Sequence, residues 1–216
     1  MTDKGIRDKE GFNSLYYATF YGHQHIIIEL GKREVPYIES FEGTTCLHVA
    51  AKKGFFEVAE IFLKYKEMFD WKLNHPWDNR IDVNARKKHK KDLGVTPAFL
   101  AAKNGNVELF QLLHENGAII EAVKCAIGGN QDLEPIHIAS KEGNFMIVQY
   151  ILSKSKNLEF VAKIKIQQTQ SAPIHLAAYG GHYEIVELLL ESGEVWNAKN
   201  LYEDTFMHIA IRHGHT

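Results

Sequence analysis

The sequence contains few cysteines and no long hydrophobic run. Only Cys46 and Cys125 occur among 216 residues, and each lies within an apolar stretch. This usage indicates two reduced, buried thiols of a cytosolic protein, with a single disulfide between them as the alternative. No segment approaches the roughly 18 consecutive apolar residues that cross a bilayer, and residues 1–10 lack the apolar core of a signal peptide. We therefore expect a cytoplasmic protein without a transmembrane segment.

An excess of charge of either sign is also absent. The chain has 25 Lys and Arg residues against 27 Asp and Glu residues, which gives a formal net charge of -2. The whole chain is therefore not attracted to nucleic acid or to an anionic membrane, and we expect no nucleic-acid partner. With 45% hydrophobic residues, the chain is long enough to bury a substantial core.

The motifs of common catalytic and nucleotide-binding sites are missing. The sequence has no Walker loop, no GxGxxG before a helix, no GxSxG and no HExxH. Gly128 and Gly129 are followed by NQDL instead of Lys-Ser or Lys-Thr. Close histidine pairs, such as His213 and His215, have no cysteine or acid at a spacing typical of zinc sites. We therefore expect no enzyme activity, no catalytic residue, no cofactor and no metal.

One short pattern, on the other hand, recurs six times. Its copies are NSLYYATFYGH, TTCLHVAAKKG, VTPAFLAAKNG, EPIHIASKEG, APIHLAAYGGH and DTFMHIAIRHGH. A glycine closes each copy, and these glycines are Gly22, Gly54, Gly105, Gly143, Gly181 and Gly214. Successive glycines are separated by 32, 51, 38, 38 and 33 residues. A period near 33 residues predicts a solenoid of structural repeats.

The residues of this pattern favour a short helix with a defined start and end. Three copies carry a threonine that can accept a backbone N–H of the first turn. Three copies carry a proline at the first helical position, where the missing backbone N–H costs no hydrogen bond. The threonines are Thr45, Thr96 and Thr205, and the prolines are Pro97, Pro135 and Pro173. The closing glycine permits a left-handed helix end. An amphipathic run such as HYEIVELLLESG then predicts a second helix.

Four histidines occupy equivalent places in the pattern. Each lies three residues after the expected cap, where a ring nitrogen can bond back to the cap or to the loop, as in a capping box. They are His48, His137, His175 and His208. Their regular placement indicates a structural role.

The pattern resembles the ankyrin repeat, whose Thr-Pro-Leu-His, Ala-Ala, Gly-His and Ile-Val-xx-Leu-Leu signature is almost complete between Ala172 and Gly193. The resemblance covers residues 8–216. It implies an all-α solenoid of stacked helix-turn-helix units, with hairpin-like loops along one edge and a concave face that binds other proteins. Departures from the signature suggest locally irregular packing, and they are Tyr16 and Phe99 for His, Ala98 for Leu, and Cys46 and Phe206 for Pro.

We expect one domain over residues 1–216. Its repeats lie near 8–39, 40–90, 91–130, 131–168, 169–199 and 200–216, and residues 64–93 contain a long insertion. The last repeat lacks its second helix, so we expect the chain to be part of a longer protein or to end inside the array. The leading function is a protein-protein interaction module of the scaffold or adaptor type. The alternative is a regulatory ankyrin domain of a larger membrane channel or enzyme.

Two surfaces are candidates for binding a partner. The first is the concave face, where the resemblance places the residues after each Ala pair, with five basic residues and one acidic one. From this face we select Phe20, Tyr21, Lys52, Lys53, Lys103, Asn104, Lys141, Tyr179 and Arg212. The second is a protruding finger from the insertion, with Trp71, Trp77, Arg86, Lys87, Lys88, Lys90 and Lys91.

Both surfaces would suit a partner with an acidic surface or peptide. The simpler alternative is that the lysines are solvated and the tryptophans cover the end of a lengthened helix. A third hypothesis is that the basic run of the finger binds anionic lipid or RNA in a salt-sensitive manner. The oligomeric state is left open.

Overall fold

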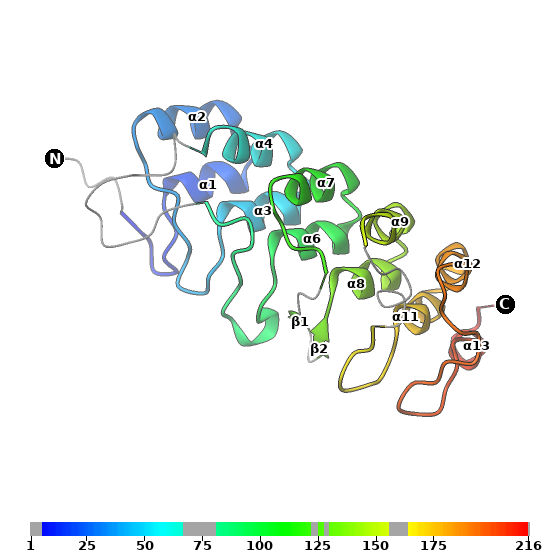
Figure 1. Cartoon of the computed structure of the whole chain (residues 1–216). Coiled ribbons are helices and arrows are strands. Elements are labelled where there is room, and N and C mark those ends of the chain that lie inside the picture. Colours follow the sequence, from blue (N-terminus) through cyan, green and yellow to red (C-terminus); the bar gives the residue numbers. More distant parts are fainter. Residues whose placement is uncertain (1–5, 67–80, 122–124, 128–129, 156–163, 216) are drawn as a thin grey trace.

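The fold is seen in a computed structural model, which describes residues 6–66, 81–121, 125–127, 130–155 and 164–215. Helices follow one another in pairs, and the pairs stack side by side from the N-terminal to the C-terminal end (Figure 1). The first helices of the pairs form one layer, which we call the inner row, and the second helices form another, the outer row. The predicted all-α solenoid is therefore confirmed.

The helix bounds show the regularity of the array. The inner row consists of α1 (Ser14–Phe20), α3 (Cys46–Lys53), α6 (Pro97–Asn104), α8 (Pro135–Lys141), α11 (Pro173–Gly180) and α13 (Phe206–Arg212). The outer row consists of α2 (Gln24–Lys32), α4 (Phe56–Lys64), α7 (Val107–Glu115), α9 (Phe145–Lys154) and α12 (Tyr183–Glu191).

The loops between the pairs project to one side of the helices (Figure 1). One of them contains the antiparallel strands β1 (Cys125–Ile127) and β2 (Asn130–Leu133). Another carries a short 3-10 helix, η1 (Lys90–Asp92), near its tip. The loops are hairpin-like, as the resemblance to the ankyrin repeat implies.

The predicted cap residues begin and end the inner helices. Thr45 and Thr96 accept the backbone N–H three residues later, at the start of α3 and α6. Pro97 opens α6, and the glycine at its other end, Gly105, has a φ of 72°. This left-handed conformation is easy only for a residue without a Cβ atom. Local sequence therefore determines where each short helix lies.

The core lies between the two rows. The alanine pairs of the inner helices are fully or almost fully buried, because their small side chains allow neighbouring helices to approach closely. Larger side chains of the outer helices fill the space beside them, among them Phe62 of α4 and Phe110 of α7. Burial of this continuous apolar core is the main favourable term in folding.

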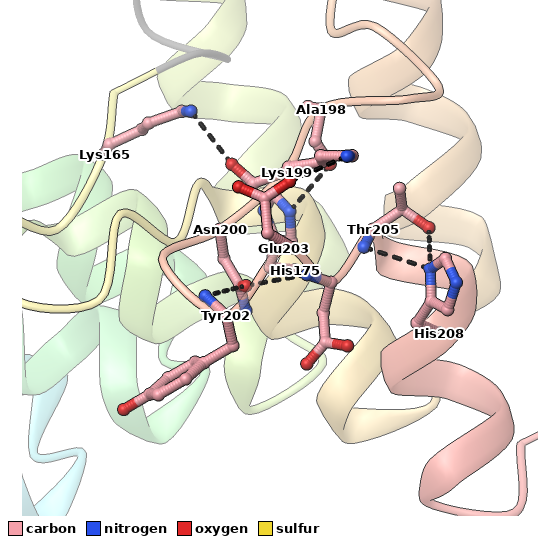
Figure 2. Close-up of polar contacts among 10 residues, drawn as sticks. Lys165, His175, Ala198, Lys199, Asn200, Tyr202, Glu203, Thr205 and His208 are labelled. Atoms are coloured by element: carbon pink, nitrogen blue, oxygen red, sulfur yellow. Dashed lines mark hydrogen bonds and ion pairs between the residues drawn. The ribbon is translucent and has the colours of Figure 1, made fainter.

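Three of the repeat histidines connect a helix start to the next loop. The backbone N–H of Ala172 donates to Nδ1 of His175, so the hydrogen of this ring lies on Nε2. Nε2 then donates to the carbonyl oxygen of Ala198 at 3.0 Å (Figure 2). His48 and His137 bond in the same way to the carbonyl oxygens of Val95 and Ile164, both at 2.9 Å. The predicted structural role of these histidines is confirmed.

Burial keeps these rings neutral. It lowers the pKa of His48 and of His137 to about 4, and it also lowers the pKa of His175, although the hydrogen bonds to the next loop oppose this shift. The fourth histidine, His208, is exposed, and among the residues described it bonds only to its own cap, Thr205.

Phe99 replaces the histidine in α6 and is fully buried. It cannot bond to the next loop. That loop is instead held by Cys125, whose thiol donates to the carbonyl oxygen of Gly94 at 3.1 Å. The departure from the repeat signature changes this junction without changing the helix order.

Outer helices also hold the ends of preceding inner helices. The side-chain amide of Asn144, which precedes α9, donates to the carbonyl oxygens of Ala102 and Lys103 at 2.7 and 3.1 Å. Nε2 of His182, which precedes α12, bonds to the carbonyl oxygen of Lys141 at 3.1 Å. These contacts satisfy carbonyl groups that a helix end leaves without an intrahelical partner.

Candidate protein-binding surface

The exposed side chains of the inner helices gather at their C-terminal turns. In α3, for example, Lys52 and Lys53 are exposed whereas the six preceding residues are buried. The same position carries the exposed Asn104 in α6 and the exposed Tyr179 in α11. Lys103 of α6 and Lys141 of α8 also lie there and are half-buried. The stacking of the inner row therefore aligns residues that lie far apart in the sequence.

Direct contacts connect the first three helices of this surface. Nζ of Lys53 lies 4.3 Å from the centroid of the Phe20 ring, a cation–π contact between α3 and α1. The side-chain amide of Asn104 donates to the carbonyl oxygen of Lys52 at 2.8 Å and so joins α6 to α3. Tyr21 lies beside Phe20, with ring centroids 5.3 Å apart.

A similar set of contacts forms the other end. Nζ of Lys141 lies 5.6 Å from the centroid of the Tyr179 ring, and this ring lies 4.5 Å from the ring of His213. Helices α8, α11 and α13 are thus joined along the same surface. The structure brings the selected residues of the inner row into one continuous strip.

We call Lys52, Lys53, Lys103 and Lys141 the lysine face. Within the part of the chain that the structure describes, none of these four side chains forms an ion pair. Arg212 differs, because its guanidinium donates two hydrogen bonds to the carboxylate of Asp204, at 2.7 and 2.8 Å. This pairing lowers the pKa of the Asp204 carboxyl group and compensates the charge of Arg212.

The basic finger is more strongly engaged within the protein than its sequence suggests. Lys88 forms an ion pair with Glu39, and its backbone N–H donates to the carbonyl oxygen of Glu42 at 2.8 Å. Nζ of Lys87 lies 3.4 Å from the carboxylate of Asp92. The contacts of Lys88 fix the finger against the preceding loop, whereas the Lys87 pair lies within the finger.

The remaining finger residues divide into three groups. The guanidinium of Arg86 bonds weakly to the carbonyl oxygen of Gly94, at 3.4 Å. Lys90 and Lys91 are exposed in η1 at the tip. Trp71 and Trp77 lie outside the residues that the structure describes, so the predicted aromatic anchors of the finger stay a prediction.

A hollow of about 240 Å³ lies where the finger meets the lysine face. Its walls come from α1, α3 and two loops, and the lining residues are Tyr16, Phe20, Thr44, His48, Val49, Lys52, Lys53 and Lys87. His48 contributes no positive charge near neutral pH, because burial lowers its pKa to about 4. The hollow therefore combines two aromatic rings with three lysines and no acidic lining residue.

Tyr16, Val49 and Thr44 line this hollow but were not predicted from the sequence as binding residues. Tyr16 precedes Phe20 by four residues, so the two rings share one face of α1, a relation that helical spacing could have indicated. The approach of Lys87 to α3 had no such local signal, because it depends on how the finger folds back.

The potential metal ligands of the described residues are dispersed. No group of three or more His, Cys, Asp or Glu side chains among them could hold a metal ion. Burial raises the pKa of the Cys46 and Cys125 thiols to about 12, so both are protonated and unreactive near neutral pH. Neither thiol belongs to a disulfide among the residues described. Within these same residues, no helix has the length and hydrophobicity of a membrane-spanning segment.

Comparisons with known proteins identify the repeat. Models of ankyrin repeats match residues 42–69, 73–164 and 174–216. The fold is similar to the crystal structure of the human ASB11 ankyrin repeat domain, with a TM-score of 0.72 and 23% sequence identity, over 93% of this chain and 78% of that one.

A curated relative is similar over part of the sequence. The target of rapamycin complex 2 subunit AVO2 of Saccharomyces cerevisiae is 28% identical over 116 residues, which are 52% of this chain. The match spans only 23% of the yeast protein.

Proposed function

Since the chain belongs to the ankyrin-repeat family, whose repeats are protein-protein interaction modules, we propose that it binds a partner protein through the lysine face. The partner presents an acidic segment or surface. The single observation that carries this proposal is the uncompensated charge of Lys52, Lys53, Lys103 and Lys141, which have no ion pair within the described structure.

Uncompensated charge of one sign is informative here because the whole chain has a formal net charge of -2. Lysines end the inner helices α3, α6 and α8, with Glu142 as the acid beside Lys141. Exposed acids such as Glu184, Glu187 and Glu191 lie on the outer helix α12. Such an arrangement attracts and orients a negatively charged partner.

Aromatic side chains give this surface a means of adding affinity to electrostatic attraction. Phe20 and Tyr179 are 37% and 47% exposed, and each ring lies beneath a lysine of the adjacent inner helix. Partly exposed aromatic rings are frequent anchors in protein interfaces. The strip therefore offers both apolar contact area and charge.

An adaptor role in the cytoplasm is the form of this function that we favour. The yeast relative is by its name a subunit of a multiprotein complex. Both cysteines are buried and neither belongs to a disulfide in the described structure, which is in keeping with a reducing compartment. Arg212, Asn104, Tyr21 and the finger residues remain proposed contacts at the margins of the lysine face.

Affinity capture with matched variants tests the proposal. One variant carries Lys52→Glu, Lys103→Glu and Lys141→Glu, and the control carries Lys32→Glu, Lys64→Glu and Lys154→Glu on the outer row, so both have the same net charge. We expect a partner that the unmodified chain captures, and that mass spectrometry identifies, to be retained by the control and lost by the first variant.

The captured partner is then purified and its affinity for each chain is measured by calorimetry. Both variants must first give the helical circular dichroism of the unmodified chain. Equal affinity of the two variants, or loss of binding by the outer-row control alone, would place the interaction elsewhere on the molecule.

A further inference from the structure

The hollow beside α1 has a size and a lining that specify more than general attraction to acids. Its volume of about 240 Å³ exceeds the roughly 150 Å³ of an engineered cavity that accepts benzene. One aromatic side chain of a partner therefore fits into it, whereas a folded element does not. The hollow suits a single anchoring residue.

The walls favour an aromatic occupant. Tyr16 and Phe20 have ring centroids 6.3 Å apart with nearly parallel planes, and Val49 adds a buried apolar surface. Aromatic pairs with offset or edge-to-face geometry at such distances gain free energy beyond their buried area. Phe20 is 37% exposed, so its ring is accessible to such a contact.

The lysines at the rim of the hollow favour negatively charged residues on either side of the aromatic occupant. Lys52 and Lys53 have no ion pair among the described residues, and Lys87 is paired at 3.4 Å with Asp92 on its own loop. No lining residue carries a carboxylate. An acidic residue that flanks the aromatic anchor would meet these ammonium groups, whereas a basic one would be repelled.

Resting on the proposed function, we infer that the hollow is the anchor site for one aromatic side chain flanked by acidic residues in the partner segment. The ring occupies the space between Phe20, Tyr16 and Val49. The flanking carboxylates pair with Lys52 and Lys53. This site gives the lysine face a defined sequence preference instead of a general affinity for acids.

Two synthetic peptides test this inference directly. Both are seven residues long, acidic and blocked at their ends; one has phenylalanine at its centre and the other alanine. Two-dimensional amide NMR of the isotope-labelled full chain follows the titration. We expect the phenylalanine peptide to shift the amides of Phe20, Val49 and Lys52, with about tenfold tighter binding than the alanine peptide.

Phe20→Ala removes an aromatic wall and leaves the lysines, so it should abolish the difference between the peptides. The matched control is Tyr179→Ala, which removes the other ring that lies beneath a lysine but does not line the hollow; it should keep the difference. Dispersed amide spectra of both variants show that they fold. If Phe20→Ala does not fold, Lys52→Met should weaken binding of both peptides while preserving their ratio.

Three results would overturn the anchor site. The first is equal binding of the two peptides, and the second is an absence of shifts at the amides of the hollow. The third is that an oligonucleotide with the same charge as the phenylalanine peptide binds more tightly than this peptide and displaces it. Each of them leaves the proposed function open to its own test, because that test also depends on Lys103 and Lys141, which do not line the hollow.

Discussion

The Nε2 atom of His137 donates a hydrogen bond to the carbonyl oxygen of Ile164 at 2.9 Å, across 27 positions of the sequence. The same ring accepts the backbone N–H of Glu134 through Nδ1, at 3.2 Å. One buried side chain thus holds both the start of α8 and the loop that leads to α11. Its removal should weaken two repeats at once.

We expect His137→Ala to lower the free energy of unfolding by about 3 kcal/mol, because it creates a cavity and leaves buried polar groups without partners. His208→Ala is the control, since His208 is exposed and bonds, within the described part of the chain, only to Thr205. It should cost about 1 kcal/mol, as for loss of a helix cap. Urea unfolding measures both, and equal losses would contradict the role of the loop contact.

Acid should destabilise the protein through the same histidine. The pKa of His137 is about 4 in the folded chain and near 6.5 in an unfolded one. Between these values the unfolded state binds more protons, so stability rises with pH in this window and is lost as pH falls from about 6.5 towards 4. The full effect is about 3 kcal/mol for one such residue.

His137→Phe tests this pH dependence, because phenylalanine already occupies the equivalent position of α6 as Phe99. Unfolding measured in urea at several pH values between 4.5 and 6.5 should give a shallower dependence of stability on pH in the variant. Between the two pKa values, the number of protons taken up on unfolding should be smaller in the variant by nearly one. An unchanged slope would show that His137 does not remain neutral in the folded state.

Gly105 is expected to tolerate no side chain. Its φ is 72°, and an added Cβ would lie 2.5 Å from Oδ1 of Asn144, whose amide group holds the end of α6. We expect Gly105→Ala to cost about 2 kcal/mol of stability. Gly117→Ala is the control, since φ is again positive but no atom lies within 4 Å of the added Cβ.

The control should cost about 1 kcal/mol from backbone strain alone. Thermal unfolding by circular dichroism compares the two variants. Equal midpoints would show that the contact with Asn144 does not restrict this position.

Electrostatic attraction predicts a salt-dependent association with the partner. Stopped-flow or surface-based kinetics should show an association rate that falls about tenfold between 50 and 500 mM NaCl. The variant with Lys52, Lys103 and Lys141 changed to glutamate should associate slowly at all salt concentrations. A rate independent of salt would contradict charge-guided recognition by the lysine face.

Much of the fold could be predicted because its determinants are local. Thr45, Pro97 and Gly105 act within one helical turn of their own position, so their identity predicts where helices begin and end. The repeat spacing then predicts the stacking. The replacement of a histidine contact by the thiol of Cys125 could not be predicted, since it depends on the position of the next loop.

The candidate surface was predictable only in part. Residues at equivalent repeat positions, such as Lys52 and Lys141, align because the repeats stack regularly. The pairing of Arg212 with Asp204 and of Lys88 with Glu39 depends on how the loops fold back against the helices, and no periodicity of the sequence reports it. These pairings separate the uncompensated lysines from those already engaged within the chain.

Lysine footprinting of the complex with the captured partner tests the central claim most directly. An amine-reactive acetylating reagent is applied to the chain alone and to the complex, and mass spectrometry measures the modification of each lysine. We predict that Lys52, Lys53, Lys103 and Lys141 become protected while Lys32, Lys64 and Lys154 react as before. Protection of the outer-row lysines, with the lysine face unchanged, would contradict the claim.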